Sequence, residues 1–375
     1  MFYPYVSENA LNYVSEVIKS RWIGQGPKVN GFEKKANEII KAPYAVAVNS
    51  SASAIRLALA IAGVGPYDEV ITTAQTCTAT NHPILEQFAR PVFADIQYLT
   101  GNMDPKDIER RITPKTKAIL PVHWAGYPCD MDEIHEIAKK HKLKVIEDCA
   151  HSVETKYKGE KTGTFGDIGC FSFYVTKNMV TAEGGMVITN NKKYAEDMRI
   201  LSLHGMSADA WKRYGSEGYK HYEVVEAGYK YNMTDIQASL GIHQLARVDK
   251  NWKRREKIWK RYMKELAGLP LILPAPVEKG TRHAYHLFTI LIDTNKTNIT
   301  RDQFLNEMTK RNIGTGVHFR ALHLQPYYRK TLGCKKGDSP NVEWIGDRTV
   351  SIPLSAKLSD RDVNDVIQAI RSILA

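Results

Sequence analysis

The stretch GCFSFYVTKNMVTAEGGMVITN, residues 169–190, contains two apolar segments with the pattern of buried strands, joined by an irregular turn that carries Lys177. A lysine between two such strands would be costly to bury as a free cation. Condensation of its amine with an aldehyde removes the fixed ammonium, so the pattern predicts a covalently bound aldehyde cofactor on Lys177. Ser172, at the end of the first strand, is placed to hold a phosphate group of that cofactor.

Two upstream segments fit the same cofactor. VIEDCAH (145–151) places Asp148 at the carboxyl end of a predicted buried strand, the edge where open α/β sheets bind ligands. A carboxylate there would keep the ring nitrogen of pyridoxal phosphate (PLP) protonated, and His151 could hydrogen-bond the ring oxygen. NSSASA (49–54) leaves a strand and opens a helix, where free N–H groups suit a phosphate. Taken singly, Asp148 and His151 could equally lie in a surface turn, and the serines could be plain N-caps.

The arrangement of apolar segments predicts an α/β fold. From residue 44 to about 190, short Val/Ile-rich segments alternate with helical patterns, which is typical of a mostly parallel sheet flanked by helices. One long helix is predicted from residue 233 to about 266, with Thr234 as its N-cap. We therefore expect a large domain over residues 1–245 and a smaller α+β domain over 246–375.

The C-terminal domain is expected to combine short strands with helices. A strand is predicted at HLFTILI (286–292), a helix over 301–311 and a short strand around Val317. A final helix is marked by Ser359 and Asp362, which together resemble a capping box.

Composition excludes several other classes. The formal charge of +11 is densest in KNWKRREKIWKRYMK (250–264), whose aromatic residues recur at near-helical spacing, so a buried stripe on a surface helix is favoured over a nucleic-acid site. The basic surface also suits a small, multiply anionic substrate. Five scattered cysteines without a C-x-x-C pair indicate free thiols and no structural metal.

Other motifs are missing. No G-x-G-x-x-G follows the first strand, which disfavours nicotinamide binding. His135 and His141 stand six apart rather than the four that a zinc-binding helix needs. The chain has no apolar stretch of about 20 residues and no signal-like start, so we expect a cytoplasmic protein that does not enter the membrane.

Together these motifs resemble the DegT/DnrJ/EryC1/StrS family of PLP-dependent sugar aminotransferases, which have fold type I, the fold of the aspartate aminotransferase superfamily. The resemblance covers nearly the whole chain. Its motifs are RWIGQGPKVNGFE, TCTATNHPI, PVHWAGYPCDMDEI, VIEDCAH, SFYVTKN, EGGMVITN, GYKYNMTDIQASLG, GVHFRALHLQPYY and IPLSAKLSDRDV.

The resemblance implies a role for each matching residue. Lys177 would form the internal aldimine, while Asp148 would contact the pyridine nitrogen and His151 the ring oxygen. The phosphate would be held by Ser172 and the backbone of Ser51 and Ala52. Asn232 would reach the phosphate of the neighbouring subunit, so the active sites would be shared in a homodimer. Six further side chains in these motifs are candidate substrate contacts: Trp22, Glu183, Lys230, His318, Arg320 and His323.

Two positions depart from the family pattern. Many members stack an aromatic ring on the cofactor where this chain has Cys77, which could lie against the PLP ring or be a small buried hydrophobe. Position 52 is often threonine, and Ala52 has no hydroxyl, which leaves the backbone and Ser51 to contact the phosphate.

The activity that the resemblance implies has two steps. Glutamate gives its amino group to PLP, and the pyridoxamine 5′-phosphate form then aminates a keto carbon of a nucleotide-diphosphate sugar. The alternatives are a PLP-dependent lyase or dehydratase on the same fold, and a non-catalytic PLP-binding regulatory protein. A related dehydratase branch replaces the lysine by histidine, so Lys177 favours transamination, and an intact Glu183 also counts against the regulatory alternative. The nucleotide, the sugar and the aminated carbon stay open.

Overall fold

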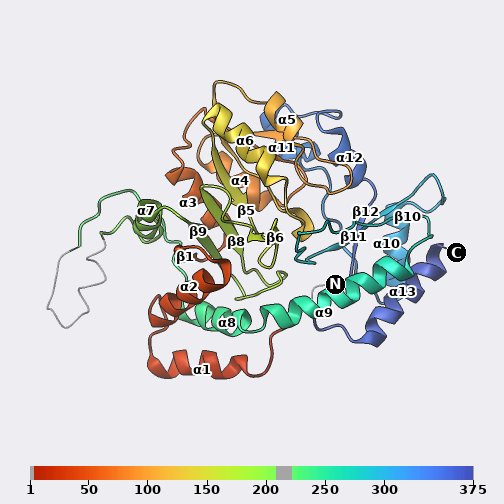
Figure 1. The fold of residues 1–375 in the computed structure, drawn as a ribbon, viewed down its shortest axis with the longest axis horizontal. Helices are drawn as coiled ribbons and strands as arrows, with labels where there is room; N and C mark the ends of the chain where they lie inside the picture. The colour runs from red at the N-terminus through yellow and green to blue at the C-terminus, as the bar shows by residue number, and fades with distance from the viewer. Residues whose placement is uncertain (1–3, 208–221, 375) are drawn as a thin grey trace.

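The computed structural model describes residues 4–207 and 222–374, and its centre is a seven-stranded sheet (Figure 1). Four of the neighbouring pairs are parallel, and the strand nearest the first strand, β9, runs antiparallel to both of its neighbours. This confirms the predicted mostly parallel sheet. In spatial order the strands are β1 (Tyr44–Val48), β9 (Gly185–Thr189), β8 (Ile168–Ser172), β5 (Lys144–Asp148), β4 (Thr116–Ile119), β2 (Glu69–Thr73) and β3 (Arg90–Ala94).

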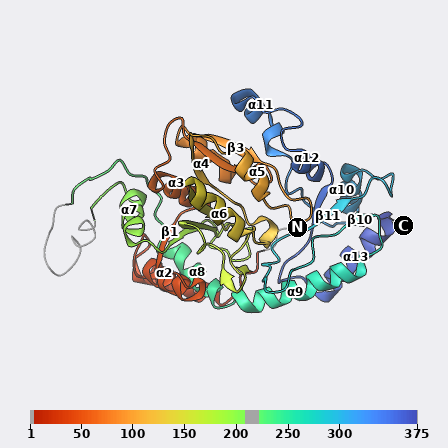
Figure 2. The same cartoon turned by 45° about the horizontal axis from the view of Figure 1, so that its top comes forward.

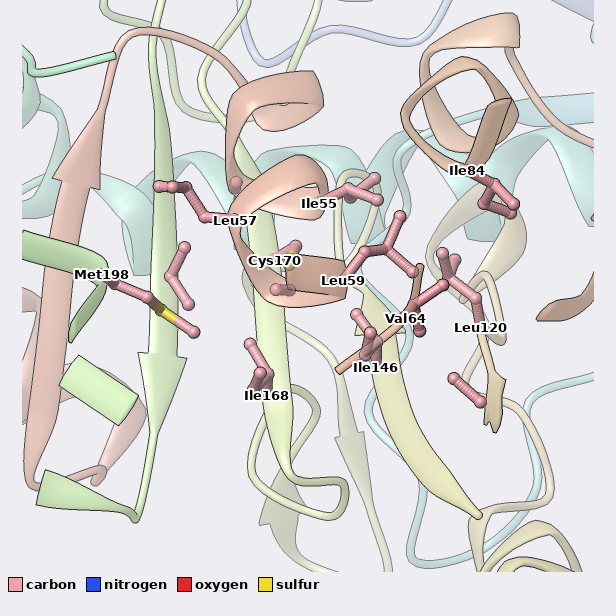
Figure 3. Close-up of a cluster of buried hydrophobic side chains, with 14 of the residues drawn as sticks. Ile55, Leu57, Leu59, Val64, Ile84, Leu120, Ile146, Ile168, Cys170 and Met198 are labelled. Atoms are coloured by element: carbon pink, nitrogen blue, oxygen red, sulfur yellow. The ribbon is translucent and has the colours of Figure 1, made fainter. Parts of the chain in front are cut away.

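Helices cover both faces of the sheet, which explains why its strands are apolar throughout. On one face, Leu57 and Leu59 of α3 (Ser51–Ile61) pack with Ile146 and Ile168 of the strands (Figure 3). The other face, which includes Ala45 and Ala47 of β1, packs against the helices α2 (Pro27–Ile40) and α8 (Asp235–Leu245). The helices and short elements of this part of the chain are α1 (Ala10–Ser20), α2 (Pro27–Ile40), α4 (Thr78–Glu86), α5 (Pro105–Arg110), η1 (Trp124–Gly126), α6 (Met131–His141), the hairpin β6 (Lys156–Tyr157) and β7 (Glu160–Lys161), α7 (Lys192–Ser202) and α8 (Asp235–Leu245).

The C-terminal part has its own core beneath a three-stranded antiparallel sheet, β10 (Leu271–Ile272), β11 (Phe288–Ile292) and β12 (Thr349–Ile352). In this core, Trp259 and Tyr262 of α9 (Val248–Glu265) are buried, as the near-helical spacing predicted. The remaining elements are α10 (Arg301–Lys310), η3 (Leu322–Leu324), α11 (Pro326–Leu332), α12 (Pro340–Gly346) and α13 (Asp360–Leu374). The Ser359–Asp362 capping box is confirmed, since each residue accepts a backbone N–H of the other.

Two predictions about this region are wrong. The short strand around Val317 is absent from the described residues, where only a single bridge joins Gly316 to Ser351. The long helix is two helices, because α8 ends at Leu245 and α9 starts at Val248. The two helices serve different cores: α8 packs on α2, whereas α9 runs along the C-terminal part towards α13 (Figures 1 and 2). The predicted domain boundary near residue 246 falls at this break and stays a prediction.

None of the helices in the described ranges has both the length and the apolarity to cross a membrane.

Asp235, the first residue of α8, fixes the start of α2. Its buried carboxylate accepts backbone N–H groups of Gly26 (2.7 Å), Lys28 (3.0 Å) and Val29 (3.0 Å).

We expect Asp235→Ala to lower the free energy of unfolding by about 3 kcal/mol, because three N–H groups lose their acceptor in a largely buried site. Urea denaturation measures this. Asp302→Ala is the matched control, since Asp302 also lies in a first turn but is exposed and should change stability by less than about 1 kcal/mol. Equal losses in the two variants would contradict the assignment.

Candidate active site

The register of the sheet brings the predicted site residues to one edge. Gly185 of β9 pairs on one side with Val48 of β1 and on the other with Ser172 of β8. Asp148, the last residue of β5, pairs with Cys170 of β8. The carboxyl ends of β1, β5 and β8 therefore lie next to one another, at the edge where parallel sheets bind ligands.

A candidate phosphate cradle lies at the end of β1. Ser50, not Ser51, is the N-cap of α3, and its Oγ accepts the Ser53 N–H at 3.1 Å. The Ser51 hydroxyl is buried without a hydrogen-bond partner among the described residues. A Cβ at Gly185 would lie 2.4 Å from the Ser50 backbone, so only glycine allows the strand to approach this turn. The free hydroxyl and the N–H groups at the helix start, including that of Ala52, fit the phosphate of PLP.

Asp148 is held as a buried acceptor that faces the site. Its Oδ1 accepts the Ala150 N–H at 2.9 Å and its Oδ2 accepts the Thr80 hydroxyl at 2.7 Å. Burial raises the pKa of Asp148, while these two hydrogen bonds and the charge of Lys177 act in the opposite direction. A protonated ring nitrogen would supply the counter-charge that the carboxylate needs. Sequence reasoning missed Thr80, although it lies in the quoted TCTATN motif.

Lys177 follows a tight turn, in which its N–H donates to the Tyr174 carbonyl at 2.9 Å. Lys177 is among the residues that line a cavity of about 50 Å³. Burial lowers the pKa of Lys177, and the charges of Asp148 and Cys77 partly oppose this shift, which places both groups near the amine. A lowered pKa increases the share of neutral amine, the form that attacks an aldehyde.

The tautomer of His151 follows from its neighbour. The Ala125 N–H donates to Nδ1 of His151 at 3.3 Å, so Nδ1 carries no proton. Burial and the nearby charge of Lys177 hold the pKa of His151 well below its usual value, so the ring is neutral. Its proton therefore lies on Nε2, which makes His151 a donor suited to the ring oxygen of PLP.

Cys77 is exposed at the N-cap position of α4, so the alternative of a small buried hydrophobe is wrong. It lines an apolar cavity of about 1050 Å³ together with His82, Tyr327 and Tyr328. Free thiols often pack as small hydrophobes. Cys77 does not, because the start of α4 faces this cavity rather than the core.

We expect Cys77→Phe to be tolerated, because a ring at this position enters the cavity rather than the core. If the ring stacks on the cofactor, the dissociation constant of PLP should fall by roughly fivefold, equivalent to about 1 kcal/mol. The control is Cys149→Phe, which should lower the thermal midpoint by overpacking, since Cys149 is buried. A lowered midpoint with unchanged PLP affinity in Cys77→Phe would exclude the stacking role.

Four of the candidate substrate residues, Trp22, Glu183, Lys230 and Arg320, are exposed. Arg320 lines the same cavity as Cys77. Trp22 is oriented by its indole N–H, which donates to the Gln25 carbonyl at 2.9 Å.

The two candidate histidines, His318 and His323, differ in burial and in their partners. His318 Nδ1 lies 2.8 Å from the Ser351 hydroxyl, and burial together with the charge of Lys177 lowers its pKa to about 4, which places it beside the amine. His323 is fully buried, and its Nε2 lies 3.0 Å from Glu343 Oε1. A substrate cannot reach His323 there, so we leave it out of the proposed contacts.

The backbone of Asn232 forms a bridge with Val48 of the same chain, and the preceding Tyr231 carbonyl accepts the Asn49 N–H at 2.7 Å. This segment therefore lies beside the chain's own phosphate turn. A contact from Asn232 to the phosphate of a neighbouring subunit stays a prediction.

A buried cluster of metal-ligand types, His123, Glu147 and Cys149, has an ordinary structural explanation. The Glu147 carboxylate already accepts three backbone N–H groups, at 2.8, 2.8 and 2.7 Å, and lies 2.9 Å from His123 Nε2. The network fixes the loop before β8.

A lysine and an aspartate at the carboxyl edge of a mostly parallel sheet, beside a phosphate cradle, define a fold type I PLP-dependent enzyme. The model of the DegT/DnrJ/EryC1/StrS aminotransferase family matches residues 4–371, and the chain belongs to this family. It is a PLP-dependent sugar aminotransferase, as the resemblance implied.

Curated relatives match along the whole chain. The chain is 49% identical over 374 residues to an uncharacterized protein of Methanocaldococcus jannaschii, with 100% of this chain and 97% of the relative covered. It is 46% identical over 372 residues to the spore coat polysaccharide biosynthesis protein SpsC of Bacillus subtilis, with 99% and 96% covered.

Solved structures agree with the fold. Spr1654 of Streptococcus pneumoniae, a proposed sugar aminotransferase in its PMP form, superposes with a TM-score of 0.93 at 32% identity, over 99% of this chain and 98% of that one. PseC of Helicobacter pylori, an aminotransferase in the biosynthesis of pseudoaminic acid, gives 0.92 at 26% identity, over 100% and 98%.

Proposed function

We propose that this enzyme transfers the amino group of glutamate to a keto carbon of a nucleotide-linked sugar, as a cytoplasmic homodimer with shared active sites. The main support for a nucleotide-linked substrate is that the cavity next to Cys77 combines a cation with aromatic side chains. Arg320 suits a diphosphate, and Tyr327 and His82 offer ring faces to a base. The relatives SpsC and PseC, named for polysaccharide and pseudoaminic acid biosynthesis, support a sugar product of this kind.

Each residue of the site has a defined task. PLP, when bound, supplies the electron-withdrawing ring that makes the amino exchange possible. Asp148, which accepts the Thr80 hydroxyl, would hold the proton on the ring nitrogen, and His151, whose Nδ1 accepts the Ala125 N–H, would donate its Nε2–H to the ring oxygen. Ser51 and Ser172 would hold the phosphate. The freed Lys177 amine takes and returns the proton at the substrate carbon.

The test is a product assay on the purified holoenzyme. Glutamate is supplied with a panel of nucleotide-linked keto sugars, and 2-oxoglutarate and amino sugar are quantified together. Equal amounts of both products support the proposal. A deoxy or unsaturated sugar without 2-oxoglutarate would favour the lyase or dehydratase alternative, and no turnover with any pair would favour the regulatory one.

A further inference from the structure

Asn178, the residue after Lys177, has its amide group oriented by two acceptors. Its Nδ2 lies 2.9 Å from Glu154 Oε2 and 3.0 Å from the Ala284 carbonyl oxygen. A carbonyl and an ionised carboxylate can only accept, so the NH₂ end of the amide must face them. Its Oδ1 therefore faces His286, with Nδ1 at 3.0 Å.

The charge of Glu154 is secured by Arg255 of α9. Both side chains are buried, and the Arg255 guanidinium pairs with the Glu154 carboxylate. The guanidinium contacts Glu154 Oε1, which leaves Oε2 as the acceptor of the Asn178 amide. This pair fixes the direction of the Asn178 amide.

The orientation of the Asn178 amide determines the tautomer of His286. Because Asn178 Oδ1 can only accept, Nδ1 of His286 must carry the proton. Burial and the charge of Lys177 hold the pKa of His286 well below its usual value, so the ring is neutral. Its Nε2 therefore presents a lone pair.

His286 and His151 form a complementary pair. Their ring centroids are 4.3 Å apart, and their tautomers are opposite, because Nδ1 accepts in His151 and donates in His286. One ring thus offers an N–H to the site and the other a lone pair. His286 and Lys177 are both among the residues that line a cavity of about 50 Å³.

We propose that His286 Nε2 accepts a hydrogen bond from the Lys177 amine whenever that amine is free, and so orients it for proton transfer. The inference rests on the proposed amino transfer through Lys177. Asn178, which directly follows Lys177, contacts the His286 ring, and the charge of Lys177 contributes to the lowered pKa of His286, so the lysine and this ring are neighbours. One N–H held in this way fixes the direction of the nitrogen lone pair, and such orientation of a reacting group contributes to rate. Glu154, Asn178 and Arg255 are positioning residues, since they act through His286.

The tautomer can be measured directly in the holoenzyme without substrate. Nitrogen NMR of protein labelled with ¹⁵N-histidine distinguishes protonated from unprotonated ring nitrogens, and the His286 signals are identified by their loss in His286→Phe. We expect Nδ1 protonated and Nε2 unprotonated at neutral pH. A proton on Nε2 in the wild-type protein would overturn the proposal, whatever the variants do.

Kinetics test the contact with the lysine. His286→Phe keeps a ring beside His151 but removes the lone pair, so kcat should fall roughly 10-fold or more with KM and PLP retention unchanged. His283→Phe is the matched control, because His283 is buried three residues away and packs on Trp259 and Tyr285, outside the cavity. It should lower kcat less than about twofold. Similar small losses in both variants would overturn the role. Failure of the wild type to turn over any donor would instead count against the proposed function, and the NMR result is independent of it.

Discussion

Lys177→Ala is expected to reduce amino transfer by on the order of 10³-fold or more, because it removes both the cofactor attachment and the amine that moves the proton. Borohydride treatment of the holoenzyme should fix PLP covalently in the wild type and not in the variant. The measurement is 2-oxoglutarate production under saturating glutamate and keto sugar, with peptide mapping of the reduced protein.

The chain offers a strict control for this experiment. Lys161 is a second partly buried lysine, and burial lowers its pKa to about 8, but it lines a different cavity and donates to the Val153 carbonyl at 3.0 Å. Lys161→Ala should keep activity and the borohydride adduct. Attachment of the cofactor to Lys161 or another lysine in the Lys177→Ala protein would show that the assignment is wrong.

Asp148→Asn is expected to keep the fold and lose activity by roughly 10²-fold or more. The amide has the same shape but no charge, so it cannot hold a proton on the ring nitrogen of PLP, which is the basis of electron withdrawal. The absorbance spectrum of bound PLP and kcat should change together, while the thermal midpoint should stay close to that of the wild type.

Thr80→Val supplies a graded comparison. It removes the 2.7 Å hydrogen bond to Asp148 but leaves the carboxylate, so its loss of kcat should be smaller than that of Asp148→Asn. Activity of Asp148→Asn near the wild-type level would remove Asp148 from the mechanism, and a larger loss in Thr80→Val would show that the hydroxyl has another task.

The local parts of the site could be predicted from the sequence. Asp148 and Ser172 stand at the ends of predicted strands, and strand ends of a parallel sheet meet at one edge whatever the details of packing. The helix caps at Thr234 and Ser359 could also be predicted from the sequence, because a cap joins residues only three apart.

Contacts between residues that are far apart in sequence could not be predicted. Thr80 and Asp148 are separated by 68 residues, and Glu154 and Arg255 by 101, so no spacing in the chain indicates their contact. The sequence left the surroundings of Cys77 open and made His323 a candidate substrate contact. Only the fold decides both positions: Cys77 is exposed, while His323 is buried against Glu343, so the prediction for His323 is wrong.

The sequence by itself determined the alternation of strands and helices from residue 44 to about 190, the lysine between apolar strands and the acid at a strand end, since periodicity and burial cost act locally. Only the tertiary structure decided the break between α8 and α9, the orphan hydroxyl of Ser51 and the proton positions on His151 and His286. The physical reason is that a hydrogen bond or a packed face depends on which distant group the folded chain places opposite it.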